Sequence, residues 1–140
     1  MTDRLMVEVS AGELLDKITI LEIKAARIAD PAKHANVAQE LSALREAASA
    51  LVESPGLEAL IRDLKSVNEA LWEIEDEIRA CEAAGAFGAR FIELARSVYV
   101  TNDRRAALKR EINLLVGSRI VEEKQYTPYE ARSQRSGGES

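Results

Sequence analysis

The sequence predicts an all-α protein in which two antiparallel helical hairpins, one of them long and coiled-coil-like, form a four-helix bundle. Hydrophobic residues make up 46% of the chain, charged residues 31% and aromatic residues only 4%, which is typical of a globular helical domain. Apolar residues recur at steps of three and four along four segments. Residues that begin or end helices separate those segments.

The first predicted helix starts after Ser10. Ser10 and Glu13 have the spacing of a capping box, in which each side chain accepts a hydrogen bond from the other residue's backbone N–H. The helix is expected to run to about Ala29, where Asp30-Pro31 stops it. Its apolar residues cover a wide arc, so we expect this helix to be buried on more than one side.

The remaining helices follow from similar signals. Asn36 with Gln39 offers a weaker cap for a second helix that ends near Glu53. Ser54-Pro55 then starts a third helix, which continues to about Glu82. Glycines at 85 and 88 bracket a turn, and a fourth helix is expected from about Ala89 to Leu115, ended by Gly117.

The last two helices carry matching apolar seams. If they fold back on each other, the facing residues lie at equal distances along the chain from Ala86, inside the glycine-bracketed turn. The predicted pairs are Leu57–Leu115, Leu60–Ile112, Leu64–Leu108, Val67–Arg105, Leu71–Thr101, Ile74–Val98, Ile78–Leu94 and Cys81–Phe91. The first two helices give a shorter version of the same pattern: Leu14, Ile18, Leu21 and Ile28 face Leu51, Ala47, Leu44 and Val37.

The two ends of the chain add smaller features. Leu5 to Val9 alternates in polarity and could form a short terminal β pairing with Ile120 and Val121. Residues 1–126 are therefore predicted as one helical domain, and residues 127–140, rich in Ser, Gly and Arg, as a flexible tail.

Charge and composition restrict the function. A formal net charge of −5 argues against general nucleic-acid binding. No stretch approaches the ~18 apolar residues of a membrane span, and Met1 to Arg4 opens no apolar signal run, so a cytoplasmic location is predicted. The single cysteine, Cys81, is interpreted as a core residue and the single histidine, His34, as a loop residue. No catalytic motif is present, so no reaction or cofactor is predicted.

The apolar seam of the long hairpin breaks at Thr101 and Arg105. A buried arginine needs partners, and Asn68, Glu69, Trp72, Asn102 and Asp103 lie within about a turn of it on the two helices. One interpretation is an ion-pair network that fixes the register, helped by the expected cross-pairs Asp76–Arg96 and Arg79–Glu93.

Two other interpretations involve a ligand. Arg104 and Arg105 could bind a small anion, such as a nucleotide or nucleotide-sugar, while Trp72 or Tyr99 stacks on it. Alternatively, two Glu-x-x-Asp pairs on facing helices could hold Mg²⁺ through carboxylate oxygens, as all-α nucleotide pyrophosphohydrolases do. The residues of those pairs are Glu13, Asp16, Glu73 and Asp76.

Four stretches together resemble a bacterial family catalogued only as a domain of unknown function, over about residues 5 to 129: SAGELLDKITILEIK (10–24), LWEIEDEIR (71–79), FIELARSVYVTNDR (91–104) and VEEKQY (121–126). The resemblance implies an accessory role in surface-polysaccharide assembly, since members occur beside or fused to glycosyltransferase and tetratricopeptide-repeat proteins. It also directs attention to polar motif residues that a plain bundle does not need. The predicted ligand- or partner-binding residues are Trp72, Glu75, Asp76, Arg79, Arg96, Tyr99, Asn102, Asp103, Arg104 and Arg105.

The predicted function is binding or assembly, through a homo-oligomer or a protein partner. The alternative is an enzyme or binder that takes a small anionic ligand. A concave pocket holding Trp72, Asn102 and Arg105 would favour the ligand, whereas a fully paired Arg105 and a large apolar interface would favour assembly.

Overall fold

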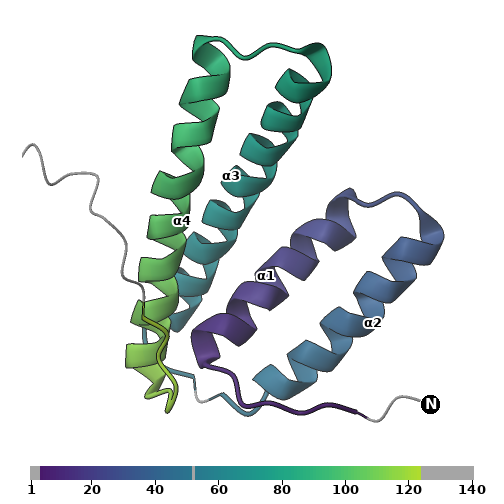
Figure 1. Ribbon diagram of the computed structural model, residues 1–140. Coiled ribbons are helices and arrows are strands. Elements are labelled where there is room, and N and C mark those ends of the chain that lie inside the picture. The colour runs from purple at the N-terminus through teal and green to yellow at the C-terminus, as the bar shows by residue number, and fades with distance from the viewer. Residues whose placement is uncertain (1–3, 52, 124–140) are drawn as a thin grey trace, which may run out of the picture.

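The computed structural model describes residues 4–51 and 53–123, and within these ranges the chain is helical and contains no strand. The helices are α1 (Ala11–Arg27), α2 (Pro31–Ala48), α3 (Leu57–Ala84) and α4 (Ala89–Val116). The predicted all-α fold is confirmed. In Figure 1, α1 and α2 lie side by side as one pair, and α3 and α4 lie side by side as a second, longer pair.

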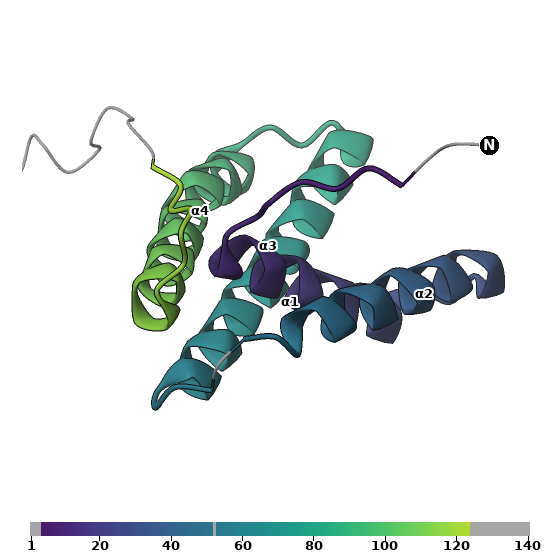
Figure 2. The same ribbon diagram turned by 90° about the horizontal axis from the view of Figure 1, so that it is seen from below.

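Helix α1 is the central member of the bundle. It packs against α2, α3 and α4, whereas α2 approaches only α1 among the helices. The view from below shows α1 between α2 and the long pair (Figure 2). These contacts cover most of its wide apolar arc. The buried residues of the arc are Leu15, Ile18, Leu21 and Ile23.

The core lies where α1 crosses the first half of α3 and the second half of α4. Leu64, Leu108 and Ile112 are between 0 and 1% exposed there. The other end of the long pair extends beyond α1 (Figure 1), and Phe87 and Ile92 near that end are exposed. Cys81, predicted in the core, is half-buried for the same reason. The residue-by-residue register of the two hairpins stays a prediction.

The boundary between α1 and α2 differs from the prediction. Helix α2 begins at Pro31, five residues before Asn36, because the Asp30 side chain caps it. The Asp30 carboxylate accepts hydrogen bonds from the N–H groups of Ala32 and Lys33, at 2.9 and 3.2 Å. Proline is tolerated at the first helical position. The Asp30-Pro31 pair therefore starts the second helix, and α1 ends at Arg27.

Glycines explain the other helix ends. Gly56 has φ of +88° and stands directly before α3, so Pro55 lies outside the helix that it was predicted to start. Gly85 and Gly117 follow α3 and α4 in the left-handed conformation, with φ of +66° and +69°. That conformation is accessible to glycine at little cost and ends a helix.

The predicted β pairing of the chain ends is wrong, since neither Leu5–Val9 nor Ile120–Val121 forms a strand. The ends meet through side chains instead. Arg119 forms an ion pair with Glu8. The turn after α4 also brings Ser118 to the start of α1, where its Oγ accepts a hydrogen bond from the Ala11 N–H at 3.3 Å. The segment after α4 thus supplies a hydrogen-bond acceptor to the first turn of α1, whose backbone N–H groups have no partner within the helix.

Among the helices in the described part of the chain, none has the length and apolar character needed to cross a membrane. The segment boundary predicted at residue 126 and the tail at 127–140 lie outside the described residues.

Candidate functional site

A buried carboxylate joins the three helices that form the centre of the bundle. Asp16 on α1 is 1% exposed. Arg105 on α4 binds it with two donors: Nε to Oδ1 at 2.9 Å, and Nη2 to Oδ2. Asn68 on α3 donates from Nδ2 to the same Oδ1 at 2.9 Å. Arg105, which interrupts the apolar seam between α3 and α4, therefore pairs with a residue of α1. Its partner is not one of the residues expected on α3 and α4.

The surrounding groups balance the charge of this pair. Lys109 donates to Glu13 at 2.5 Å, and its Nζ lies 4.0 Å from Asp16. Two carboxylates on α1 thus face two cations on α4, which offsets the cost of burying each charge. The hydrogen bond from Arg105 to Asp16 raises the pKa of the arginine, although burial acts in the opposite direction.

The start of α1 is held against α4 at very close range. The Gly12 N–H donates to Asn113 Oδ1 at 2.6 Å. A Cβ at Gly12 would lie 2.5 Å from the Lys109 carbonyl oxygen, so only glycine permits this approach. The contact sets how deeply α1 sits on α4, and with it the position of Asp16 opposite Arg105.

Glu122 closes the same end of the bundle. Its carboxylate accepts hydrogen bonds from Ser10 Oγ at 2.5 Å and from Asn113 Nδ2 at 3.2 Å. Ser10 Oγ also accepts from the Glu13 N–H at 3.1 Å, as a helix cap does. Burial alone would raise the pKa of Glu122, but the hydrogen bonds and the positive charge of Lys109 lower it overall.

An open cleft of about 530 Å³ lies beside the Asp16–Arg105 pair, between α1, α3 and α4. We call it the Trp72 cleft. It has apolar, cationic and anionic sides, and its lining residues are Ile20, Lys24, Asn68, Leu71, Trp72, Glu75, Asp76, Arg79, Asn102 and Arg105. Trp72 is the chain's only tryptophan. Its ring lies 5.7 Å from the Arg27 guanidinium carbon, a cation–π contact with the end of α1.

Two polar side chains, Arg105 and Asn68, each bind the buried Asp16 and also line the cleft. Arg105 uses the Nε/Nη2 edge of its guanidinium for Asp16, and no hydrogen bond within residues 4–51 and 53–123 engages Nη1. Asn68 uses both hydrogens of Nδ2, for Asp16 and for Thr19 Oγ1 at 2.8 Å. Because the described residues contain no buried side-chain N or O atom without a partner, the Asn68 Oδ1 acceptor is open to the cleft.

The structure brings together most of the predicted binding residues. Those lining the Trp72 cleft are Trp72, Glu75, Asp76, Arg79, Asn102 and Arg105. The others lie elsewhere on α4 and are exposed: Arg96, Tyr99, Asp103 and Arg104.

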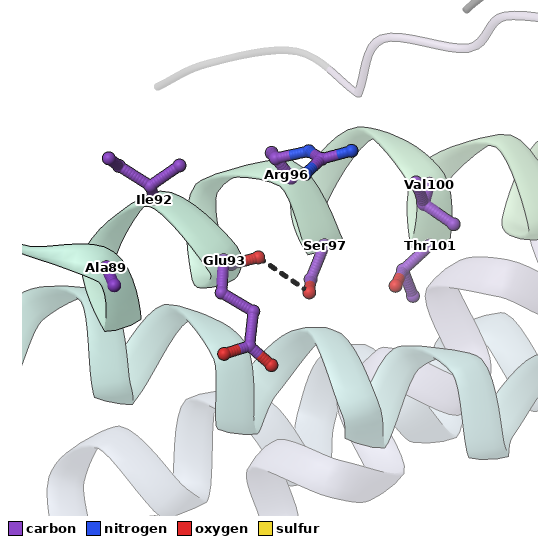
Figure 3. A pocket seen from close by; sticks show the side chains of 7 residues that line it. All are labelled: Ala89, Ile92, Glu93, Arg96, Ser97, Val100 and Thr101. Atoms are coloured by element: carbon purple, nitrogen blue, oxygen red, sulfur yellow. Dashed lines mark hydrogen bonds between the residues drawn. The ribbon is translucent and has the colours of Figure 1, made fainter.

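Arg96 belongs to a different surface. It lines a shallow depression of about 450 Å³ that is formed by α4 alone, together with Ile92 and Val100. In Figure 3, Ile92 and Glu93 project from opposite sides of the helix, and the Ser97 hydroxyl donates to the Glu93 carbonyl oxygen at 2.9 Å.

The expected cross-pairs between α3 and α4 are not among the ion pairs of the described residues. Arg79 pairs with Glu75 on its own helix at 3.8 Å, and Glu93 pairs with Arg90 at 3.3 Å. The cross-link near this end of the long pair joins Arg90 to Glu77 at 2.5 Å instead.

The four carboxylates proposed for Mg²⁺ are not gathered into one site. Asp16 is bound by Arg105, Glu13 by Lys109 and Glu73 by Arg27. Asp76 lines the Trp72 cleft. In the part of the chain that the structure describes, no group of three or more His, Cys, Asp or Glu side chains could hold a metal ion.

The α1 side of the site was not predicted: Ile20 and Lys24 line the cleft, and Asp16 is the partner of Arg105. One signal was available. Gly12, Asp16 and Thr19 recur at steps of three and four, so small and polar residues share a helical face that borders the apolar arc. A stripe of this kind indicates close packing with polar partners across the helix interface.

The amino-acid sequence matches the profile of a family described as being of unknown function, DUF6165, over residues 5–137. No curated protein and no solved structure matches the chain.

Proposed function

We propose a binding function for this chain, which belongs to the DUF6165 family: the Trp72 cleft takes up a small ligand that carries an anionic group. One observation carries this proposal. The cleft is lined both by an aromatic ring, Trp72, and by Arg105, whose orientation is set by a buried carboxylate. Mostly apolar clefts with a few oriented polar groups are the usual form of small-molecule sites.

Arg105 is suited to receive an anion. The guanidinium is planar and has two edges that can each bind a pair of oxygens. Asp16 occupies the edge formed by Nε and Nη2, while Nη1 makes no hydrogen bond to the residues that the structure describes, and Arg105 lines the cleft. Asp16 is 1% exposed and holds the guanidinium with two hydrogen bonds, while the Arg105 side chain remains 29% exposed. The buried Asp16 therefore supports a fixed donor, which binds with less loss of side-chain entropy than a free one.

Lys24 gives the cleft a second cation. It lies on α1 two turns after Asp16, and no ion pair within the described ranges occupies its Nζ. Lys24 and Arg105 come from different helices, so a ligand held by both would bridge α1 and α4.

Trp72 supplies the test, because its fluorescence reports on this cleft alone. Titration with inorganic pyrophosphate is expected to change the emission in a saturable way. Lys24→Met should weaken binding about tenfold, which corresponds to about 1.4 kcal/mol. Lys17→Met is the matched control, since Lys17 is an exposed lysine on α1 that does not line the cleft. The absence of saturable binding to the unaltered protein, or equal losses in both variants, would overturn the proposal.

Assembly through an oligomer or a partner protein, the other predicted function, has weaker support. An interface on α1 would need exposed apolar residues there, but Leu15, Leu21 and Ile23 are buried and the helix packs against α2, α3 and α4. Of the apolar side chains that stay exposed on α4, Ile92 and Val100 line the shallow surface of Figure 3, whereas Leu114 and Leu115 lie near the C-terminal end of the helix. A surface made by one helix has fewer converging groups than the Trp72 cleft, so we favour the ligand. The accessory role in surface-polysaccharide assembly stays a prediction, since the family description names no activity.

A further inference from the structure

The Trp72 cleft holds unpaired acceptors as well as donors. Asp76 on α3 lines it without an ion pair to any residue that the structure describes. Among the residues that the structure describes, Glu75 forms an ion pair with Arg79 alone, at 3.8 Å between side chains that are 52 and 80% exposed. Such an ion pair contributes little. Both carboxylates are therefore able to accept hydrogen bonds from a ligand.

Arg105 and Asn68, which both bind Asp16, repeat this arrangement in their part of the cleft. Arg105 presents N–H donors there, and Asn68 beside it presents the Oδ1 acceptor, because Nδ2 is held by Asp16 and Thr19. A bare anion would accept hydrogen bonds from Arg105, but its oxygens could not donate one to Asn68 Oδ1. A ligand with a hydroxyl next to its anionic group would satisfy both.

The charge balance argues in the same direction. Lys24, Arg79 and Arg105 line the cleft together with Glu75 and Asp76. Asp16 behind Arg105 compensates that arginine, so the remaining cations and carboxylates are equal in number. A bare multivalent anion can bind the cations of such a site, but it leaves the two carboxylates without hydrogen-bond donors. The site favours an anion that also brings hydrogen-bond donors to the carboxylates.

The apolar wall indicates the shape of the rest of the ligand. Ile20, Leu71 and Trp72 line the cleft from α1 and α3. At about 530 Å³ the cleft falls within the range of sites for drug-sized ligands and is larger than a bare oxyanion needs. A flat indole face packs well against the C–H groups of a ring.

We infer that the ligand of the Trp72 cleft is a phosphate ester of a hydroxylated ring compound, of the chemical class of a phosphorylated sugar. The phosphate would bind between Arg105 and Lys24, a ring face would pack on Trp72, and hydroxyls would donate to Asp76, Glu75 and Asn68. The inference rests on the proposed function and specifies its ligand class.

The test compares three probes by Trp72 fluorescence at constant ionic strength: glucose 6-phosphate, inorganic phosphate and glucose. Glucose 6-phosphate is expected to bind at least about tenfold more tightly than either of the others. Asp76→Ala should remove most of this advantage while leaving phosphate binding unchanged or improved, since it deletes a negative charge. Asp63→Ala is the matched control, because Asp63 is an exposed carboxylate on α3 outside the cleft.

The outcomes separate this inference from the proposed function. Equal binding of glucose 6-phosphate and inorganic phosphate would overturn the ligand class and leave anion binding in place. Tighter binding of a zwitterion such as aspartate would also overturn it, because the carboxylates would then be receiving an ammonium group. If neither these anions nor pyrophosphate changes the Trp72 fluorescence, both proposals are overturned.

Discussion

Asp16 and Arg105 form a pair whose two members sit in different surroundings. The carboxylate is 1% exposed and has Arg105 and Asn68 as donors, whereas the guanidinium is 29% exposed at its side chain and reaches the cleft. Removing the arginine would strand a buried charge, while removing both would leave a site that apolar side chains can fill. Removing only one member of the pair is therefore expected to destabilise the protein.

Arg105→Leu is expected to lower the free energy of unfolding by about 3 kcal/mol, because Asp16 loses its two-donor partner. Lys109, whose Nζ lies 4.0 Å away, compensates only part of that loss. Urea denaturation of the single variant and of Asp16→Leu/Arg105→Leu measures the effect. The double variant should regain most of the stability, and a single variant as stable as the unaltered protein would refute the buried pair.

Gly12 tests the close approach of α1 to α4. Gly12→Ala should destabilise the protein by about 2 kcal/mol, since its Cβ would meet a backbone oxygen that cannot move without shifting α4. Gly88→Ala is the control: its Cβ would meet nothing within 4 Å, and its φ of −83° suits alanine. Thermal unfolding of the two variants should differ clearly in midpoint. Similar midpoints would show that the helices are not in close contact at Gly12.

Among the secondary-structure elements, the positions of the helices could be predicted, but the contacts between the two pairs of helices could not. Apolar spacing identified all four helices, because each buries one face and the spacing records that face. The start of α2 was misplaced because Asp30-Pro31 can follow one helix or begin another. The partner of Arg105 was missed because the periodicity of α3 and α4 describes only their own seam, whereas Asp16 arrives from the other pair.

The candidate site was predicted in part for the same reason. Trp72, Asn102 and Arg105 were found because they interrupt or flank the α3–α4 seam, and all three line the cleft. Lys24 and Ile20 were not found, since neither interrupts a pattern within α1. How one hairpin lies on another depends on the shapes of both, and a local sequence pattern does not record it.

Helix α2 should open more readily than the other helices. It packs only against α1, so its backbone hydrogen bonds can break without separating α1 from α3 or α4. Hydrogen–deuterium exchange followed by mass spectrometry is expected to show faster exchange for Leu41–Leu44 than for Leu108–Ile112. Equal protection of the two segments would mean that α2 is part of the same cooperative unit.

Over the molecule as a whole, carboxylates link the segment before α1 to the segment after α4. Glu122 accepts hydrogen bonds from Ser10 and Asn113, and Glu8 pairs with Arg119. The pKa of Glu122 is lowered overall because its hydrogen bonds and the charge of Lys109 outweigh burial. The pKa of Glu8 is lowered chiefly by its hydrogen bond to Arg119.

These shifts predict a loss of stability in acid. A carboxylate whose pKa is lower in the folded protein contributes stability above its unfolded value of 4.5, and loses it as the pH falls through the folded value. The thermal midpoint should therefore drop as the pH falls below about 4.5. Glu122→Gln should make the drop smaller, and Glu111→Gln, on the exposed part of α4, should not. An unchanged drop in Glu122→Gln would remove Glu122 from this role.

The most direct test of the account is to locate the bound ligand on the molecule. Amide chemical shifts of ¹⁵N-labelled protein, followed by NMR during titration with glucose 6-phosphate, report every helix in one experiment. We predict chemical-shift changes confined to the Trp72 cleft, around Lys24, Asn68 to Arg79, and Asn102 to Arg105, with α2 unaffected. Shifts centred on Ile92 to Val100 of α4, or no shifts at saturating ligand, would contradict this prediction.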